Sequence, residues 1–188
     1  MSTATIELAP LSATNSHEYR KTRKYSDPHS TLRRIPSPIG RIEIRGDGTA
    51  ITALSIESNG SLPADNLPEN SDALLDLAAA QLAEYFRGER TTFEVPVSPS
   101  GSAFQQAVWR ELLALPYGTV TSYGELGRAT GRVAAGRAVG GAVGANPIPI
   151  IIPCHRVLAS DMRITGYSGG NGIPTKEWLL AREGIAHK

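Results

Sequence analysis

The fold is decided by the stretch at residues 121–144, TSYGELGRATGRVAAGRAVGGAVG. A hydroxyl side chain, from Thr121 or Ser122, can cap a short helix over 123–129, and a second helix is expected over roughly 134–145. Two short helices joined by a tight, glycine-containing turn are typical of a helix-turn-helix, whose second helix commonly enters a groove of DNA. Helix pairs of this shape also occur in proteins that never meet DNA, so the pattern alone leaves the partner open.

The second of these helices has an unusual composition. It contains Gly136, Gly140, Gly141 and Gly144, and each glycine costs up to about 1 kcal/mol relative to alanine inside a helix. Its one long polar side chain is Arg137, which could enter a base stack or contact phosphates. A nearly smooth helix suits close approach to a narrow groove, although tight packing inside the protein would favour the same small residues.

An apolar run ends in chemistry-bearing side chains at residues 150–157, IIIPCHRV. Cys154 is the only cysteine of the chain, and His155 and Arg156 could supply the cationic neighbourhood that holds a reactive thiolate. A structural thiol needs only an apolar hole. On these residues alone both readings stay open, because adjacent side chains on a strand point to opposite faces.

The rest of the chain divides into a leader and two units. We expect residues 1–30 to be a mostly disordered leader, residues 31–97 a small α+β unit, and residues 98–188 a mainly helical unit. The expected elements are strands at Arg33–Ile35, Arg41–Arg45, Ala50–Ile56 and Phe93–Val97, and helices at Asp72–Arg87, ended by Gly88, and Ala103–Leu115.

Composition excludes several classes of protein. A single cysteine excludes an intramolecular disulfide and a cysteine-cluster zinc site. We also expect no metal and no cofactor. The sequence contains no apolar stretch long enough for a membrane span, and we expect a cytoplasmic protein. Residues 1–97 carry a net charge of −3 and residues 98–188 a net charge of +4, which suits a polyanionic partner for the second unit.

Several motifs, in order along the chain, resemble the O6-alkylguanine-DNA alkyltransferases, also called methylated-DNA–protein-cysteine methyltransferases. They are Phe104-Gln105, Val108-Trp109, Pro116-Tyr117-Gly118, Thr121-Ser122-Tyr123, Arg137-Ala138-Val139-Gly140, Asn146-Pro147, the residues from Pro153 to Val157, from Gly166 to Gly170, and from Lys176 to Leu180. The match is strong over 104–184, looser over 31–97 and absent over the leader. The resemblance implies an α+β protein, with a small ribonuclease H-like amino-terminal domain and a helical, winged-helix-like carboxy-terminal domain.

The resemblance also implies a reaction and its residues. The protein would flip O6-alkylguanine out of duplex DNA and transfer the alkyl group irreversibly to Cys154, once per molecule; activity on O4-alkylthymine stays open. By similarity, His155 acts through a water as the base, Glu183 orients the imidazole, Tyr123 donates a proton to the leaving base, and Asn146 joins the thiol network. From the residues alone, the plainer interpretations are favoured: Tyr123 as a core aromatic, Glu183 as a surface acid, and Asn146 as a turn residue.

The remaining implied positions bind DNA or the flipped base. Duplex DNA is expected in the minor groove against Arg137, Ser122, Ala135, Gly136, Gly140 and Gly141, and the flipped base against Tyr123, the Val157 carbonyl, Ser168, Gly169 and Trp109. We expect a monomer that does not bind membranes, with cooperative binding on DNA left open.

Three departures from the family pattern accompany the match. Met162 stands where a turn glycine is usual, and Val133 and Gly136 differ from the commoner proline and alanine.

Three other functions compete with repair. A lesion sensor would lack the acceptor cysteine, a cysteine hydrolase would need an oxyanion arrangement, and a transcription factor would carry more base-reading side chains on its recognition helix.

Overall fold

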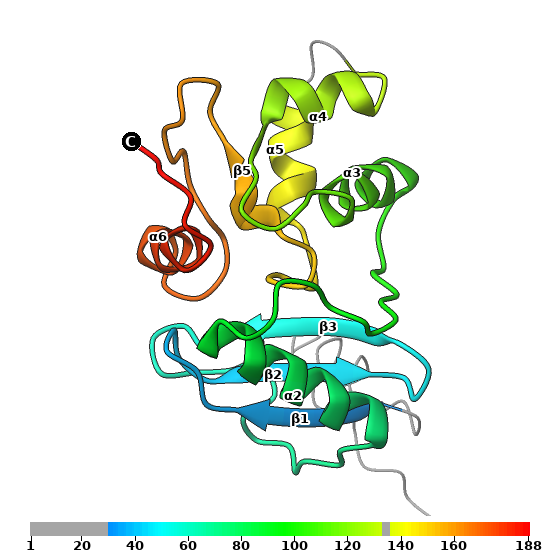
Figure 1. Cartoon of the computed structure of the whole chain (residues 1–188). Helices are drawn as coiled ribbons and strands as arrows, with labels where there is room; N and C mark the ends of the chain where they lie inside the picture. The colour runs from blue at the N-terminus through cyan, green and yellow to red at the C-terminus, as the bar shows by residue number, and fades with distance from the viewer. Residues whose placement is uncertain (1–29, 133–135) are drawn as a thin grey trace, which may run out of the picture. The chain divides into compact units, whose positions relative to one another are not determined.

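Short alternating segments after residue 30 form an antiparallel sheet. In the computed structural model, which describes residues 30–132 and 136–188, its strands are β1 (Thr31–Ile35), β2 (Ile42–Gly46) and β3 (Ile51–Ile56), in that order across the sheet (Figure 1). Ile42 and Ile44 of β2 are fully buried, as alternate residues on one face should be. The three predicted strands are confirmed to within two residues.

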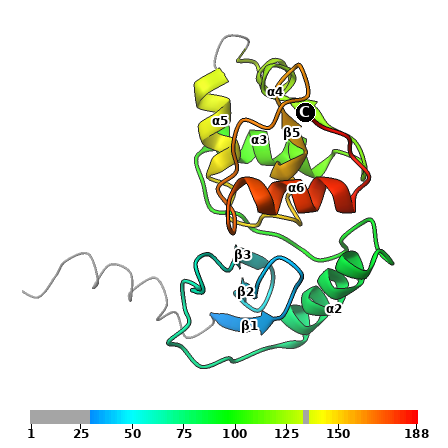
Figure 2. The ribbon, with the colours of Figure 1, turned by 90° about the vertical axis from the view of Figure 1, so that its left-hand side faces the viewer.

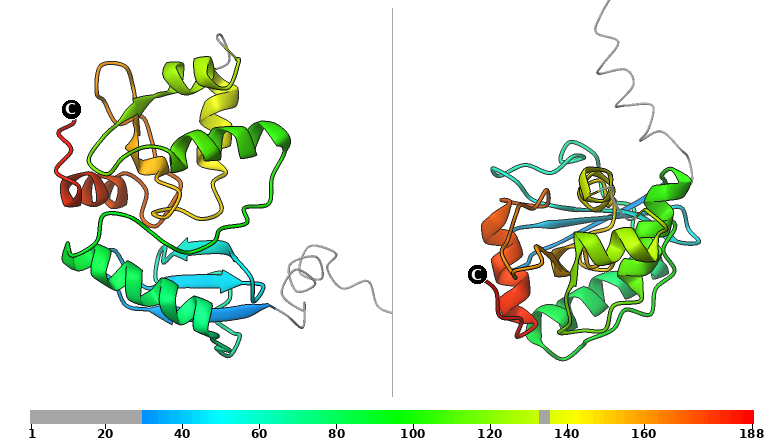
Figure 3. Two further views of the ribbon diagram at one scale, coloured as in Figure 1. Left: turned by 45° about the vertical axis from the view of Figure 1, so that its right-hand side comes forward. Right: turned by 90° about the horizontal axis from the view of Figure 1, so that it is seen from above.

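One long helix packs on this sheet. α2 (Ala73–Arg87) begins after Asp72, whose carboxylate accepts a hydrogen bond from the Leu75 amide, and it contacts β1 and β2 (Figure 3). It ends at Gly88, which adopts the left-handed conformation at φ 86° that favours glycine. The predicted end at Arg87 is confirmed, and the helix starts one residue after the predicted Asp72, which is its N-cap.

The strand predicted at Phe93–Val97 is wrong. Only Val97 pairs with the sheet, through an isolated parallel bridge to Ile51, in which the Ile51 amide bonds to the Pro96 carbonyl. Pro96 has no amide hydrogen and cannot donate to a ladder, so the segment pairs at a single point.

The helix-turn-helix forms in the second half of the chain. α3 (Ala103–Leu113) and α4 (Tyr123–Ala129) each begin with a capping box, Ser102 with Gln105 and Ser122 with Glu125. α5 (Gly136–Gly144) contacts both α3 and α4 (Figure 2). The bounds predicted for α4 are confirmed, with Ser122 rather than Thr121 as its cap. α3 ends two residues before the predicted Leu115, and the expected start of α5 at 134 lies outside the described residues.

A close backbone approach holds the turn after α4. The Arg132 amide donates to the Gly127 carbonyl at 2.6 Å, and a side chain at position 127 would collide with the Arg132 carbonyl oxygen. Glycine is therefore the residue that lets the chain fold back so soon after the helix.

The segment around Cys154 is not the strand that we expected. Cys154–Arg156 form a single 3-10 turn, η1, followed by β5 (Val157–Leu158) and, further on, by α6 (Ile173–Arg182). β5 pairs in parallel with β4 (Thr121–Ser122), Thr121 lying opposite Val157. In the loop after β5, Met162 adopts φ 68°, the left-handed region where glycine is usual.

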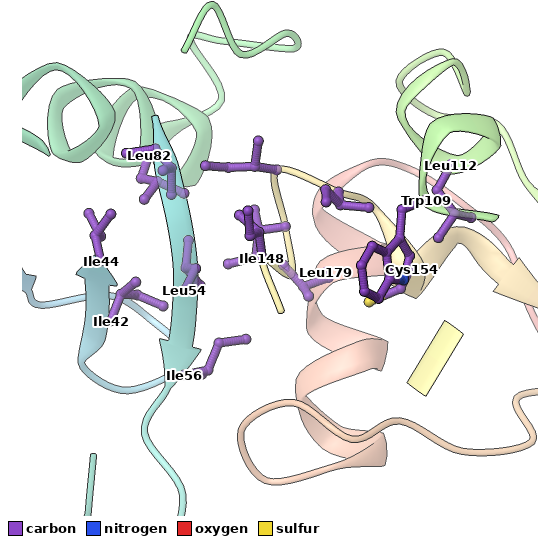
Figure 4. Packing of buried hydrophobic residues seen from close by; sticks show 14 of the residues in the cluster. Ile42, Ile44, Leu54, Ile56, Leu82, Trp109, Leu112, Ile148, Cys154 and Leu179 are labelled. Atoms are coloured by element: carbon purple, nitrogen blue, oxygen red, sulfur yellow. The ribbon is translucent and has the colours of Figure 1, made fainter. Parts of the chain in front are cut away.

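The core is continuous from the sheet to the cysteine. One buried cluster joins Ile42, Leu54 and Leu82 of the first half to Trp109, Cys154 and further residues of the second half (Figure 4). The Leu54 amide donates to the Pro147 carbonyl at 2.8 Å, so β3 is also hydrogen-bonded to the segment that leads to Cys154. Within the described ranges, no helix is both long enough and apolar enough to cross a bilayer.

Candidate active site

Cys154 lies at the wall of a cavity. The thiol residue is 4% exposed, and the cavity beside it has a volume of about 240 Å³. A cavity of roughly 150 Å³ holds a benzene molecule, so this one has room for a bicyclic base. Its lining residues come from α4, α5, η1, the loop before α6, and α6 itself: Tyr123, Gly140, Val143, Gly144, Cys154, Gly166, Tyr167, Ser168 and Lys176.

The parallel pairing of β4 with β5 explains why these segments meet. Tyr123 directly follows β4, and Cys154 lies in the turn that directly precedes β5. Because Thr121 is opposite Val157, the pairing brings the start of α4 to the end of η1. Tyr123 and Cys154, 31 positions apart in the sequence, therefore line one cavity.

His155, Arg156 and Glu183 form a buried network behind the thiol. His155 Nε2 lies 2.8 Å from Glu183 Oε1, and both side chains are fully buried. Arg156 donates from Nε to Oε2 at 2.7 Å and from Nη2 to Oε1 at 3.0 Å, a two-pronged ion pair. Glu183 ends α6 as its C-cap residue. The alternative interpretation of Glu183 as a surface acid is therefore wrong.

The protonation states of this network follow from its contacts. Burial alone would raise the pKa of Glu183, but the hydrogen bonds and charges of His155 and Arg156 outweigh it and lower that pKa to about 2. An ionised carboxylate only accepts hydrogen bonds, so His155 Nε2 carries the proton and Nδ1 carries the lone pair. Burial lowers the pKa of His155 below 6.5, although Glu183 opposes the shift. Nδ1 is buried and bonds to none of the described residues.

The cation that acts on the thiol is not the one we expected. Arg156 is neutralised by Glu183, and the charge that favours the Cys154 thiolate comes from Lys176. Burial raises the pKa of Cys154, while Asn146, Tyr167 and Lys176 lower it to a smaller extent. The resting thiol is therefore protonated.

Lys176 is one of the most deeply buried polar residues of the chain. It is 1% exposed, and its Nζ donates to the Val157 carbonyl at 2.6 Å and to the Gly166 carbonyl at 3.4 Å. Burial lowers its pKa from 10.5 to about 8. The Val157 carbonyl, which we expected to face the flipped base, thus already accepts a hydrogen bond from Lys176.

Asn146 holds the turn before the cysteine. Its Nδ2 donates to the Ile152 carbonyl at 2.8 Å, and its Oδ1 accepts from the Ile148 amide at 3.0 Å. These two bonds close the loop between α5 and η1. Asn146 therefore stabilises the turn and also lies beside the Cys154 thiol.

The other residues expected around the flipped base divide into two groups. Tyr123 and Ser168 line the cavity; the Tyr123 hydroxyl accepts from Thr165 Oγ1 at 3.1 Å, and Ser168 Oγ donates to the Gly144 carbonyl at 2.8 Å. Trp109 is set back in the core, where its Nε1 donates to the Ala142 carbonyl at 2.9 Å and ties α3 to α5. Gly169 is also outside the lining, tightly against the Tyr167 ring.

Three of the four glycines of α5, Gly136, Gly141 and Gly144, face outward rather than into the core. A methyl group at Gly136, Gly141 or Gly144 would meet no atom within 4 Å, whereas one at Gly140 would reach the Tyr123 ring at 3.9 Å. Internal packing therefore does not account for these glycines. Arg137 is exposed on the same helix and makes no hydrogen bond or ion pair with any residue in the described ranges.

Ala135 and Val133 lie outside the described residues. Ser122 is the cap of α4, and its Oγ accepts from the Glu125 amide at 3.2 Å. Across residues 30–132 and 136–188, no group of three or more His, Cys, Asp or Glu side chains could hold a metal ion.

Sequence reasoning gave no role to Lys176, although it stands in a quoted motif. A lysine followed by Glu177 and Trp178 on an amphipathic helix reads as a surface residue, because lysine is almost never fully buried without a partner. The only available signal was its position: Lys176 falls three residues before the buried Leu179, on the inner face of α6.

Comparison with known families covers most of the chain. The profile of the 6-O-methylguanine DNA methyltransferase DNA binding domain matches residues 103–185, and that of the ribonuclease-like domain of the same methyltransferases matches residues 32–99.

Individual relatives agree with these profiles. A methylated-DNA–protein-cysteine methyltransferase of Haemophilus influenzae is 43% identical over 155 residues, which cover 81% of this chain and 85% of that protein. One from Methanosarcina acetivorans is 40% identical and covers 79% and 94%. The crystal structure of Mycobacterium tuberculosis O6-methylguanine methyltransferase superposes with a TM-score of 0.73 at 42% identity, over 82% of this chain and 92% of that one. A structure of the M. tuberculosis protein in complex with DNA matches equally well, with a TM-score of 0.73.

Proposed function

Because the chain belongs to the 6-O-methylguanine DNA methyltransferase family, we propose that it repairs DNA by moving an alkyl group from O6 of guanine onto Cys154. The observation that carries the proposal is a lone thiol at a base-sized cavity, with a buried imidazole and carboxylate behind it. In the reaction, the Sγ–carbon bond forms as the carbon–O6 bond breaks. A thioether does not return its alkyl group, so each molecule acts once.

His155 is the base that removes the thiol proton. Glu183 holds Nε2–H, so Nδ1 is the nitrogen left to accept a proton. We propose that one water carries that proton from Sγ to Nδ1. The low pKa of His155 keeps the imidazole neutral and ready at neutral pH.

Lys176 stabilises the negative charge that appears on sulfur. The thiol pKa is raised by burial, so the thiolate forms only as the proton leaves, and a nearby ammonium lowers the cost of that step. The departing guanine carries the displaced electron pair and takes a proton from the Tyr123 hydroxyl, which lines the same cavity.

The exposed face of α5 is the surface that enters the minor groove of duplex DNA. Gly136 and Gly141 leave it without projecting side chains, so the helix backbone can approach closely. Gly140 belongs both to this helix and to the cavity lining, which supports a cavity that lies next to the proposed DNA-binding face. Arg137, less than one turn before Gly140, fills the space that the flipped base vacates and offsets part of the unstacking cost. Ser122 and Ala135 complete the expected contacts.

The flipped guanine lies against Tyr123, Ser168 and Lys176 in this proposal. The Val157 carbonyl takes part through the ammonium that it holds, and Trp109 supports the cavity wall from behind α5.

One chain supplies all of these residues, which supports action as a monomer. A reactive free thiol persists in a reducing compartment, which supports the cytoplasm.

The test is the mass of the protein after reaction. Incubation with a duplex that contains O6-methylguanine should add about 14 daltons, localised to Cys154 by peptide mapping. Cys154→Ser, which keeps the size of the side chain but replaces the strong nucleophile, should gain nothing, as should the wild-type chain with an unmodified duplex. If the wild-type protein stays at its original mass after complete incubation, the proposed function is wrong.

A further inference from the structure

Glu183 accepts hydrogen bonds from three separate segments of the chain. Besides His155 and Arg156 of η1, its Oε2 lies 3.4 Å from the Gly118 amide, in the turn after α3. The remaining donor is the Tyr85 hydroxyl, 2.9 Å from Oε1. Tyr85 belongs to α2, 98 positions away in the sequence. Of the donors to the Glu183 carboxylate, Tyr85 is the one that lies within residues 31–97.

Tyr85 is fixed so that its hydroxyl points at Glu183. It lies in the last turn of α2, is 1% exposed, and its ring stands at 81° to that of Tyr117 with centroids 6.4 Å apart. The Arg182 guanidinium donates from Nε to the Tyr85 carbonyl at 2.9 Å. A side chain at Gly88 would collide with that guanidinium, so the glycine that ends α2 also admits the end of α6.

The hydroxyl can only donate in this setting. Burial and the charge of Glu183 both raise the pKa of Tyr85, so it stays protonated over the working range of the protein. Glu183 is ionised and has no proton to give. The bond therefore draws electron density from the same oxygen, Oε1, that holds His155 Nε2.

We propose that Tyr85 is a positioning residue for alkyl transfer: its hydroxyl holds the Glu183 carboxylate and limits how strongly that carboxylate attracts a proton to His155. The proposal rests on the function proposed above. It also gives the amino-terminal half of the protein a part in the chemistry, through one buried hydrogen bond rather than through substrate contact.

The effect depends on the groups around the imidazole. The charged groups that act on His155 are Glu183, Arg156 and Lys176, and those that act on Tyr85 are Glu183 and Arg156, with Tyr117 nearby. Removing the Tyr85 hydroxyl leaves Oε1 with fewer donors, so the carboxylate stabilises a protonated His155 more strongly. The pKa of His155 then rises, and a protonated imidazole cannot take the thiol proton.

The decisive variant is Tyr85→Phe, which keeps the buried ring and removes one oxygen. Single-turnover rate constants are measured from about pH 5 to about pH 9 on the O6-methylguanine duplex. We expect the acid limb to move up by about half a pH unit to one unit, which slows the reaction about three- to tenfold on that limb and leaves the rate on the plateau above it nearly unchanged. An NMR titration of His155 should show the same upward shift without any substrate.

Tyr117→Phe is the matched control. Its hydroxyl is also part of this aromatic cluster, but it donates to the neutral Arg182 carbonyl at 2.9 Å and not to the carboxylate. We expect its acid limb to coincide with that of the wild type. Replacement of Tyr85 by 3-fluorotyrosine, a stronger hydrogen-bond donor with nearly the same shape, should move the acid limb in the opposite direction. This second test remains available if Tyr85→Phe does not fold.

The possible results separate the two proposals. If the wild type is alkylated but Tyr85→Phe loses the same factor at every pH, or loses nothing, Tyr85 is only structural. An equal shift in Tyr117→Phe would also overturn the inference. If the wild type gains no alkyl mass while the His155 titration shifts as expected, the repair function fails and the coupling of Tyr85 to His155 stands.

Discussion

Replacing Gly141 by alanine should make the protein more stable and its DNA binding weaker. Gly141 is exposed on α5, and a methyl group there would meet no atom within 4 Å in the free protein. The native backbone is helical, so alanine fits without strain. Alanine is favoured over glycine inside a helix by about 0.8–1.0 kcal/mol, which corresponds to a rise in melting temperature of about 2–4 °C for a chain of this size.

The same methyl group should obstruct the DNA. If the α5 backbone lies against the groove, an added carbon either pushes the helix away or distorts the contact. Overpacking of a well-fitted contact costs about 1–3 kcal/mol, which weakens the affinity by a factor of about five to about 150. Fluorescence anisotropy with a labelled duplex measures the affinity, and thermal unfolding followed by circular dichroism measures the stability.

A matched control makes the opposite substitution, alanine to glycine, on a different helix. Ala80 is exposed on α2, and Ala80→Gly should lower stability by a similar amount with no change in affinity. Such a result shows that affinity does not simply follow stability. If Gly141→Ala is stabilised as expected but binds duplex DNA with wild-type affinity, α5 does not approach DNA closely, and the binding surface proposed here is wrong.

Two further predictions concern cations. Arg137→Ala should weaken duplex binding and slow repair of duplex substrate, while free O6-methylguanine base still alkylates Cys154 at the wild-type rate. The control Arg110→Ala removes an exposed charge from α3 and should change neither rate. Equal losses on the duplex and on the free base would make Arg137 structural. Because the pKa of Lys176 is about 8, its ammonium is lost above that pH and the alkylation rate should fall there. Lys176→Met should be about tenfold slower or more near pH 7 and should lack this basic limb; a basic limb that persists in the variant would assign it to another group.

The local parts of the fold were readable from the sequence because they depend on neighbours along the chain. Ser122 with Glu125, and Asp72 with Gly88, mark helix ends through side-chain and backbone bonds that span a few residues. The strand predicted at 93–97 failed because its apolar alternation was not matched by pairing with the sheet. Pairing is a property of the partner strand, and here it amounts to one bridge to Ile51.

The chemistry of the site could be predicted only in part, because residues next to Cys154 in the sequence are not all next to it in space. Arg156 stands two residues from Cys154 and appeared to be its cation, but the 3-10 turn sends its guanidinium to Glu183 instead. The cation that acts on the thiol, Lys176, lies 22 positions further on, at a buried site where lysine is rarely found. The Tyr85 hydroxyl reaches the network from the other half of the chain. These contacts exist only once the two halves share a core.

The charges of this network suit an acceptor that reacts once. The Glu183 and Arg156 pair carries no net charge, the buried His155 is neutral, and burial keeps the Cys154 thiol protonated. A standing thiolate would be open to oxidation and to stray electrophiles, and either would consume the protein without repairing anything. In the mechanism proposed above, the proton leaves sulfur only when His155 can take it and Lys176 can stabilise the resulting negative charge. The burial that raises the pKa of Cys154 is therefore compatible with a reactive site, since it keeps the resting nucleophile in its unreactive form.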